Sequence, residues 1–302
     1  WVCKAKPHRD NQWTPASALS PRVFDRIRRR NHGMHLLRLL STCLPAATAA
    51  WGVPSVAPNF RRLVLVRHGA VAREDNDPPV PPSAYYGGSI DVPLSAQGKA
   101  EALAAAALIA SELSTEVKAL WASPMRRALF GARAAGTALA AGAAEWSPPM
   151  EVETFEAFRE IDRGVWGDEG SWSGLTEAEI EALAGPSALA KCALETEQGK
   201  YRGINGGEGF CDVRARTLAQ RDALLPLLPL GGAAVVVSHL WVTRALVGEA
   251  LCIEDPRELD IPTASVSVVD YPAEWSSAEW AAGRGEAPVV RVRGFKPAAA
   301  AV

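Results

Sequence analysis

The stretch Leu63-Val64-Leu65-Val66-Arg67-His68-Gly69 decides the fold of this 302-residue chain. Such a run of branched apolar residues is typical of a strand buried on both faces of a parallel sheet. It ends abruptly in Arg67 and His68, and Gly69 then allows a tight turn or the close approach of a ligand. Because ligands of open α/β sheets bind beyond the carboxyl ends of the strands, this end is a candidate site. A surface arginine beside a histidine that caps the sheet is the simpler alternative.

Strand and helix patterns alternate after this stretch, which predicts an α/β fold: a three-layer αβα sandwich with a mostly parallel central sheet. The expected strands after the first are 117–121, 150–155, 233–239, 266–270 and 289–292. The expected helices are 98–111, a segment that ends near 141, one that follows the capping box at 176–179, one around 213–225, and 241–251.

We expect three regions in the chain: an amino-terminal extension (1–60), a folded domain (61–273), and an extra strand with a flexible tail (274–302). Within the extension, no acidic residue follows Asp25, and a short apolar segment after Met34 ends in small residues. This composition is typical of a targeting segment. An organellar transit peptide (plastid or mitochondrion), a secretory signal and an unaddressed, disordered extension remain alternatives, with a cytoplasmic location in the last case.

The composition excludes several classes of function. The formal net charge is −2, whereas proteins that bind nucleic acid usually carry a clear excess of basic residues. No uninterrupted apolar stretch is long enough to span a bilayer. The five cysteines lack C-x-x-C spacing, so we expect free thiols rather than a zinc site or a disulfide framework.

Four side chains are expected to converge at one edge of the sheet. His239 ends a second apolar strand as His68 ends the first, and Arg127 opens a helix directly after a third strand. Because parallel strands end at the same edge, Arg67, His68, Arg127 and His239 can meet in one pocket. The convergence of all four residues on one edge would arise by chance much less often than any single motif.

This set of side chains suits the chemistry of phosphate esters. Guanidinium groups contact phosphate oxygens in bidentate fashion, and a neutral imidazole can attack phosphorus. A carboxylic acid can protonate the leaving oxygen. Glu160, in a charged segment after the third strand, is the first candidate for this acid, with Glu208 and Glu74 as weaker ones. A solvated surface carboxylate paired with a neighbouring arginine is the alternative for Glu160.

Several motifs together resemble the histidine phosphatase superfamily, in its phosphoglycerate-mutase-like branch. They occur in order over roughly residues 62–271, and each alone is less specific than the set. The motifs are Leu65-Val66-Arg67-His68-Gly69, Asp91-Val92-Pro93-Leu94-Ser95-Ala96-Gln97-Gly98, Ser123-Pro124-Met125-Arg126-Arg127-Ala128, Phe158-Arg159-Glu160-Ile161-Asp162-Arg163-Gly164-Val165-Trp166, Gly206-Gly207-Glu208 and Val236-Val237-Ser238-His239.

The resemblance implies a role for each candidate residue. His68 would be the nucleophile that becomes phosphorylated, and Glu160 the proton donor. Arg67, Arg127 and His239 would hold the phosphoryl group, and no metal or other cofactor would be needed. The family's arginine directly precedes the alanine, which favours Arg127 over Arg126.

Two departures from the family pattern stand near the predicted site. Glu74 occupies a position where many members carry an asparagine, and Asn76 lies close by in the sequence. A carboxylate that faced a phosphate would repel it, so we expect a shifted loop or a Glu74 that points elsewhere. Leu240-Trp241 follows His239 where members often carry glycine. These larger residues would narrow the pocket or contact the substrate; the alternative is that Trp241 only packs on the sheet.

The leading hypothesis is a metal-independent phosphatase that hydrolyses a small phosphorylated metabolite through a phosphohistidine intermediate. A phosphoglycerate mutase would use the same residues, and a binding or regulatory protein that has lost turnover is the hypothesis from a different class. The expected partner is the small phosphorylated substrate, without nucleic acid and without stable membrane insertion. The oligomeric state is open, with a homodimer as one option.

Overall fold

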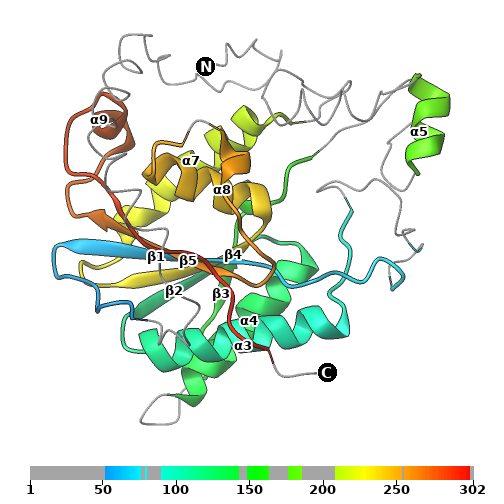
Figure 1. Cartoon of the computed structure of the whole chain (residues 1–302). Helices are drawn as coiled ribbons and strands as arrows, with labels where there is room; N and C mark the ends of the chain where they lie inside the picture. Colours follow the sequence, from blue (N-terminus) through cyan, green and yellow to red (C-terminus); the bar gives the residue numbers. More distant parts are fainter. Residues whose placement is uncertain are drawn as a thin grey trace.

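A central sheet covered by helices on both faces forms the body of the protein (Figure 1). The computed structural model describes residues 52–75, 79, 90–142, 148–162, 176–185, 208–253 and 255–299. Within these ranges the strands are β1 (Phe60–Arg67), β2 (Val117–Ala122), β3 (Val152–Thr154), β4 (Ala233–Ser238), β5 (Val266–Pro272) and β6 (Val289–Phe295). The α-helices are α3 (Ala96–Leu113), α4 (Arg126–Ala141), α5 (Glu177–Ala184), α7 (Phe210–Leu224), α8 (Leu240–Ala250) and α9 (Ser277–Ala281). The predicted three-layer α/β fold is confirmed.

The strand order β3-β2-β4-β1-β5-β6 explains why the motif residues meet. β1, β2, β3 and β4 are parallel to one another, whereas β5 runs antiparallel to β1 and β6 antiparallel to β5. β4 lies between β1 and β2, and in this register Arg67 pairs with Ser238 while Ala122 pairs with Val237. The carboxyl ends of three strands therefore lie side by side at one edge.

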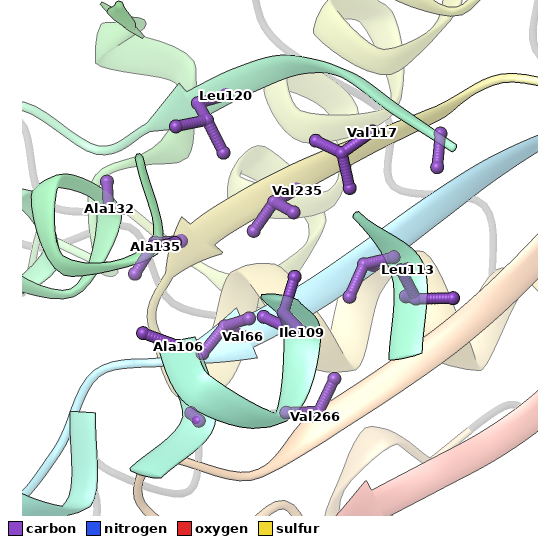
Figure 2. Close-up of a cluster of buried hydrophobic side chains, with 14 of the residues drawn as sticks. Val66, Ala106, Ile109, Leu113, Val117, Leu120, Ala132, Ala135, Val235 and Val266 are labelled. Carbon is purple, nitrogen blue, oxygen red and sulfur yellow. The ribbon is translucent and has the colours of Figure 1, made fainter. Parts of the chain in front are cut away.

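The two faces of the sheet bury two separate apolar clusters, because successive side chains of a strand point to opposite faces. On one face, Val66 and Val235 pack with Ile109 of α3 and Ala132 of α4 (Figure 2). On the other face, the alternate residues of β1 and β4 pack against α7 and α8. The residues on this second face include Leu63, Leu65, Ala234, Val236, Val213, Leu224, Val242 and Leu246.

Side chains cap the amino ends of two helices, one of them at the capping box that the sequence predicted. Thr176 and Glu179 form a capping box at the start of α5, in which the Glu179 carboxylate accepts from Thr176 N at 2.6 Å and Thr176 Oγ1 accepts from Glu179 N at 3.3 Å. Ser95 caps α3 by accepting from Gly98 N. Both caps satisfy amide groups that a helix cannot pair internally.

Other expectations need correction or lie outside the described residues. Between the expected strands 266–270 and 289–292, where no helix was expected, the chain forms the short helix α9. Cys252 is a free thiol, but Cys211 is disulfide-bonded, so the expectation of free thiols is wrong for Cys211. Residues 1–51 of the predicted amino-terminal extension lie outside the described residues. Among the described helices, none is long and apolar enough to cross a membrane.

Candidate active site

His68 lies at the carboxyl end of β1, buried with 6% of its surface exposed. Its Nδ1 lies 2.7 Å from the carbonyl oxygen of Gly69. A carbonyl oxygen only accepts, so Nδ1 carries the proton and Nε2 keeps its lone pair. Burial, the largest cause, and the nearby charge of Arg127 lower the pKa of His68 to about 3. The imidazole is therefore neutral near pH 7, with Nε2 available as a nucleophile.

The turn after His68 is fixed by two glycines in close contact. A Cβ atom at Gly69 would lie 2.2 Å from the carbonyl oxygen of Gly98, and one at Gly98 would lie 1.8 Å from the carbonyl oxygen of Ala70. The buried carboxylate of Glu101 accepts from Ala70 N at 3.0 Å and pairs with Lys296 at 2.8 Å. Gly69 therefore allows the tight turn that was predicted, and Gly98 of α3 leaves the space that this turn needs.

Arg67 and Arg127 are both held by backbone carbonyl groups. Arg67 Nη1 donates to Ile261 O at 2.7 Å, and Arg127 Nη1 donates to Ile90 O at 3.1 Å. Arg127 lies in the first turn of α4, only 1% exposed, with Asp91 Oδ1 at 3.7 Å from its Nη1. Because Arg127 and Arg67 both lower the pKa of His68 and of His239, these two charges act on both imidazoles.

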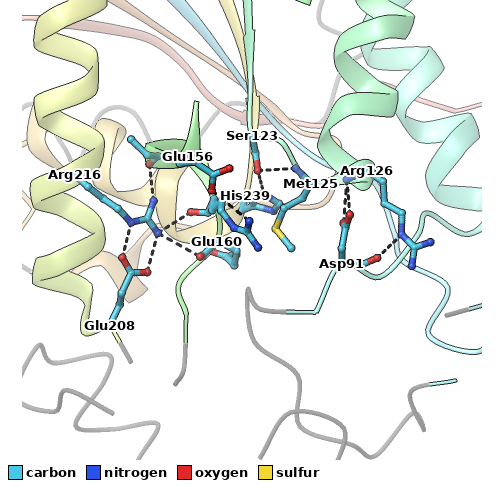
Figure 3. A network of polar contacts seen from close by, with 11 residues as sticks. Asp91, Ser123, Met125, Arg126, Glu156, Glu160, Glu208, Arg216 and His239 are labelled. Carbon is cyan, nitrogen blue, oxygen red and sulfur yellow. Dashed lines mark hydrogen bonds and ion pairs between the residues drawn. The ribbon is translucent and has the colours of Figure 1, made fainter. Parts of the chain in front are cut away.

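His239 is the residue before α8 and is fully buried. Its ring lies 5.1 Å from that of His68, at an interplanar angle of 62°. Its Nε2 lies 2.8 Å from Ser123 Oγ, at the end of β2 (Figure 3). Burial, followed by the charge of Arg127, lowers the pKa of His239 well below its usual value. The two histidines that end separate strands are therefore close neighbours, and both are neutral.

Glu160 is brought to the same place by a contact with the chain after His239. Its Oε1 accepts from Trp241 N at 3.2 Å and from Ile161 N at 3.0 Å. The side chain is partly exposed, unlike those of the two histidines. One carboxylate oxygen is thus anchored at the start of α8, on the amide of the second residue after His239.

Arg216 of α7 holds the segment that carries Glu160 (Figure 3). Its guanidinium donates to the backbone carbonyls of Ala157 at 2.5 Å, Arg159 at 2.8 Å and Glu160 at 3.3 Å. The same group forms a two-point ion pair with Glu208, at 2.6 and 2.9 Å. Glu208 Oε2 also accepts from Asp162 N at 2.9 Å. Glu208 is therefore a structural partner of Arg216, and the sequence-based option that it is the proton donor is not supported.

Three further predictions concern residues at the edge of the site. Glu74 is exposed, so its charge points to solvent, whereas Asn76 lies outside the described residues. Arg126 is exposed and its side chain donates to the backbone oxygen of Asp91, in contrast to the buried Arg127. Trp241 is 4% exposed and packs on Phe210 at 5.5 Å between ring centroids. The side chain of Trp241 therefore packs in the core and does not narrow the pocket.

The sequence motifs contained Ser123 without a role and did not include Arg216. A hydroxyl at the end of a buried strand, four residues before Arg127, was the available signal for Ser123. For Arg216 no local signal was available, because its partner Glu208 lies before the first residue of α7 and the contact depends on the path of the chain there. In the part of the chain described here, no group of three or more His, Cys, Asp or Glu side chains could hold a metal ion.

A family model for the histidine phosphatase superfamily (branch 1) matches residues 63–282, well over half of the chain. The chain belongs to this superfamily. A search of curated proteins finds no significant match. The sequence-based recognition of the family is therefore confirmed by a match that spans the four residues around which the site is built.

Solved structures of other superfamily members have the same fold. Mycobacterial glucosyl-3-phosphoglycerate phosphatase matches at 25% identity and a TM-score of 0.55, over 78% of this chain and 99% of that protein. A protein described as mycobacterial hydrolase 2 matches at 23% identity and a TM-score of 0.58, over 80% and 93% of the two chains. A putative alpha-ribazole-5'-P phosphatase from Escherichia coli matches at 18% identity and a TM-score of 0.56, over 80% and 100%. Phosphatases are thus represented among the structural neighbours of this histidine phosphatase superfamily member.

Proposed function

We propose that this histidine phosphatase superfamily member hydrolyses a small phosphomonoester through a phosphohistidine intermediate. The observation that carries the proposal is the state of His68. Its Nδ1–H donates a hydrogen bond to Gly69 O, and its pKa is lowered to about 3, so Nε2 keeps its lone pair. A neutral, oriented imidazole beside two arginines is suited to in-line attack on phosphorus.

In the first step, His68 Nε2 forms a bond to phosphorus while the bond from phosphorus to the ester oxygen breaks. Glu160, in its protonated form, gives its proton to the leaving oxygen, and the product alcohol departs. Arg67, Arg127 and His239 hold the phosphoryl oxygens and stabilise the charge spread over them in the transition state. The carboxylate of Glu160 that results is anchored by the amide groups of Ile161 and Trp241.

In the second step, water attacks the phosphohistidine and Glu160 takes up a proton from it. The nitrogen–phosphorus bond breaks, inorganic phosphate is released, and both residues return to their starting states. The partner of the protein is then a small phosphorylated molecule.

The experiment measures release of inorganic phosphate from a generic aryl phosphate and a panel of sugar phosphates, in the presence of a chelator. We expect turnover by the native protein, none by His68→Ala, and an acid-labile phosphoryl label on His68 after rapid quenching. Loss of turnover in Arg127→Ala should contrast with nearly native activity in the matched variant Arg126→Ala, since Arg126 is exposed. Absence of both phosphate release and label would overturn the proposal. Label that passes to a second substrate hydroxyl instead of water would indicate a mutase.

The role of Glu160 is tested by the dependence of rate on the leaving group. Glu160→Gln removes the proton donor, and general acid catalysis contributes about 100-fold to 10,000-fold in rate. We expect the largest loss for alkyl phosphates, whose alkoxide leaving groups need the proton most, and a small loss for nitrophenyl phosphate. An equal, small loss for both substrates would assign Glu160 a structural role.

A further inference from the structure

The second imidazole of the site, His239, has one nitrogen with a partner and one without. Nε2 lies 2.8 Å from Ser123 Oγ. Nδ1 is buried, and no described residue forms a hydrogen bond with it. Since Nε2 is already engaged, Nδ1 is the ring atom left to contact a group bound beside His68, whose ring is 5.1 Å away.

The hydrogen atoms around Ser123 can be counted. A serine hydroxyl donates once and accepts twice. Ser123 Oγ accepts from the amide of Met125 at 3.3 Å, which leaves its own hydrogen to be placed. His239 Nε2 is the acceptor within reach. If Nε2 carried the hydrogen instead, the hydroxyl hydrogen would lack an acceptor among the contacts that the described residues make.

The two tautomers of His239 also differ in what they present to an anion. With Nε2 as acceptor, the neutral ring carries its hydrogen on Nδ1 and offers a donor to a phosphoryl oxygen. With the hydrogen on Nε2, Nδ1 would present a lone pair to that oxygen, which is repulsive. Hydrogen-bond partners commonly fix the tautomer of a functional histidine in this way.

We propose that Ser123 is a positioning residue, which donates its hydroxyl hydrogen to His239 Nε2 and thereby holds the Nδ1–H tautomer toward the phosphoryl group. The inference rests on the proposed function only for the identity of the group that Nδ1 meets. Ser123 itself does not touch the reacting atoms in this scheme. It acts through His239, from the end of β2, across the sheet edge to the start of α8.

The test is a long-range proton–nitrogen correlation spectrum of the resting, histidine-labelled protein near neutral pH. The His239 signals are assigned by their absence in His239→Asn. We expect Nδ1 to resonate as a protonated nitrogen and Nε2 as an unprotonated, hydrogen-bonded one. A spectrum of the native protein with the proton on Nε2 would overturn the proposal. Because no substrate is present, this result is independent of whether the protein hydrolyses phosphomonoesters.

Variants then link the tautomer to binding. In Ser123→Ala we expect a mixture of both tautomers and a loss of about 10-fold to 100-fold in affinity for orthovanadate and in kcat/KM for an aryl phosphate. Ser123→Thr keeps the hydroxyl and should restore a single tautomer and most of the affinity. Ser238→Ala is the matched control, because Ser238 adjoins His239 and its buried Oγ has no hydrogen-bond partner among the described residues. A Ser123→Ala protein with an unchanged tautomer and unchanged affinity would also overturn the proposal.

Discussion

The imidazole rings of His68 and His239 lie 5.1 Å apart, edge to face, although they end two strands that are far apart in the sequence. β1 and β4 are direct parallel neighbours, so the two histidines follow the paired residues Arg67 and Ser238. Both rings are buried. In each ring one nitrogen has a hydrogen-bond partner in the protein, and the other nitrogen is left to contact a bound group. The sheet register thus produces a pair of neutral imidazoles with different partners: a backbone carbonyl for one and a hydroxyl for the other.

We predict that burial of neutral His68 makes the fold sensitive to acid. Its pKa is about 3 in the folded protein against 6.5 for a histidine in an unfolded chain, so the unfolded chain binds a proton between these pH values and the folded chain does not. The contribution of neutral His68 to the free energy of unfolding is fully present above about pH 6.5, and it is lost as the pH falls toward 3. At pH 5 this histidine lowers the free energy of unfolding by about 2 kcal/mol relative to pH 8. His239 acts in the same direction.

Urea unfolding at pH 8, 6.5 and 5 checks this prediction. The variant His68→Asn carries no titrating group at this position, so its free energy of unfolding should depend less on pH over this range. The comparison concerns the slope with pH, not the absolute stability of the variant. Equal slopes in the two proteins would contradict a strongly lowered pKa at His68.

We predict that Gly98→Ala impairs both stability and turnover. The new Cβ atom would lie 1.8 Å from Ala70 O, a backbone atom of the turn that follows His68. The turn must move, at a cost of about 1–3 kcal/mol or more, and His68 moves with it. Thermal unfolding and phosphate release measure the two effects. Gly142→Ala is the control, because its nearest atom is 3.6 Å away; a variant at Gly98 that matches it would contradict the close contact.

We predict that Arg216 contributes to turnover through the position of Glu160. Lysine retains the charge, but its single ammonium group lacks the planar set of N–H donors with which Arg216 contacts three carbonyl groups and a carboxylate. In Arg216→Lys we expect kcat for alkyl phosphates to fall about 10-fold to 100-fold, with little change for nitrophenyl phosphate, since the proton donor is displaced. Arg214→Lys, exposed on the same helix, is the control. An equal loss for both classes of substrate would indicate general destabilisation instead.

We predict that Asp270 stabilises the fold without affecting the site. Its carboxylate binds buried Arg62 at 2.7 and 3.0 Å and Arg291 at 2.8 Å, near the amino end of β1 and away from His68. Asp270→Ala leaves Arg62 short of a partner, and breaking a buried ion pair costs about 3–5 kcal/mol. Chemical unfolding measures the loss. The double variant Arg62→Met/Asp270→Leu should recover part of it, and kcat at low temperature should stay native in both.

Much of the fold could be predicted from local signals in the sequence. The branched apolar segments at 63–66 and 233–237 predict buried strands, because only a strand covered on both faces is apolar throughout. The capping box at Thr176 is a local hydrogen-bond pattern, so it too was readable. The helix within 274–286 was missed, since a helix of five residues has too few turns to produce a periodic pattern.

The sequence by itself determined which chemistry this protein carries. Arginine and histidine at the ends of apolar strands are local features, so Arg67, His68, Arg127 and His239 and their family could be recognised without coordinates. Only the tertiary structure decided how these groups are held. The contact of Ser123 with His239 and the hydrogen bonds of Arg216 to the Glu160 segment join residues distant in the chain. Hydrogen-bond partners of this kind depend on strand order and register, which local sequence patterns do not specify.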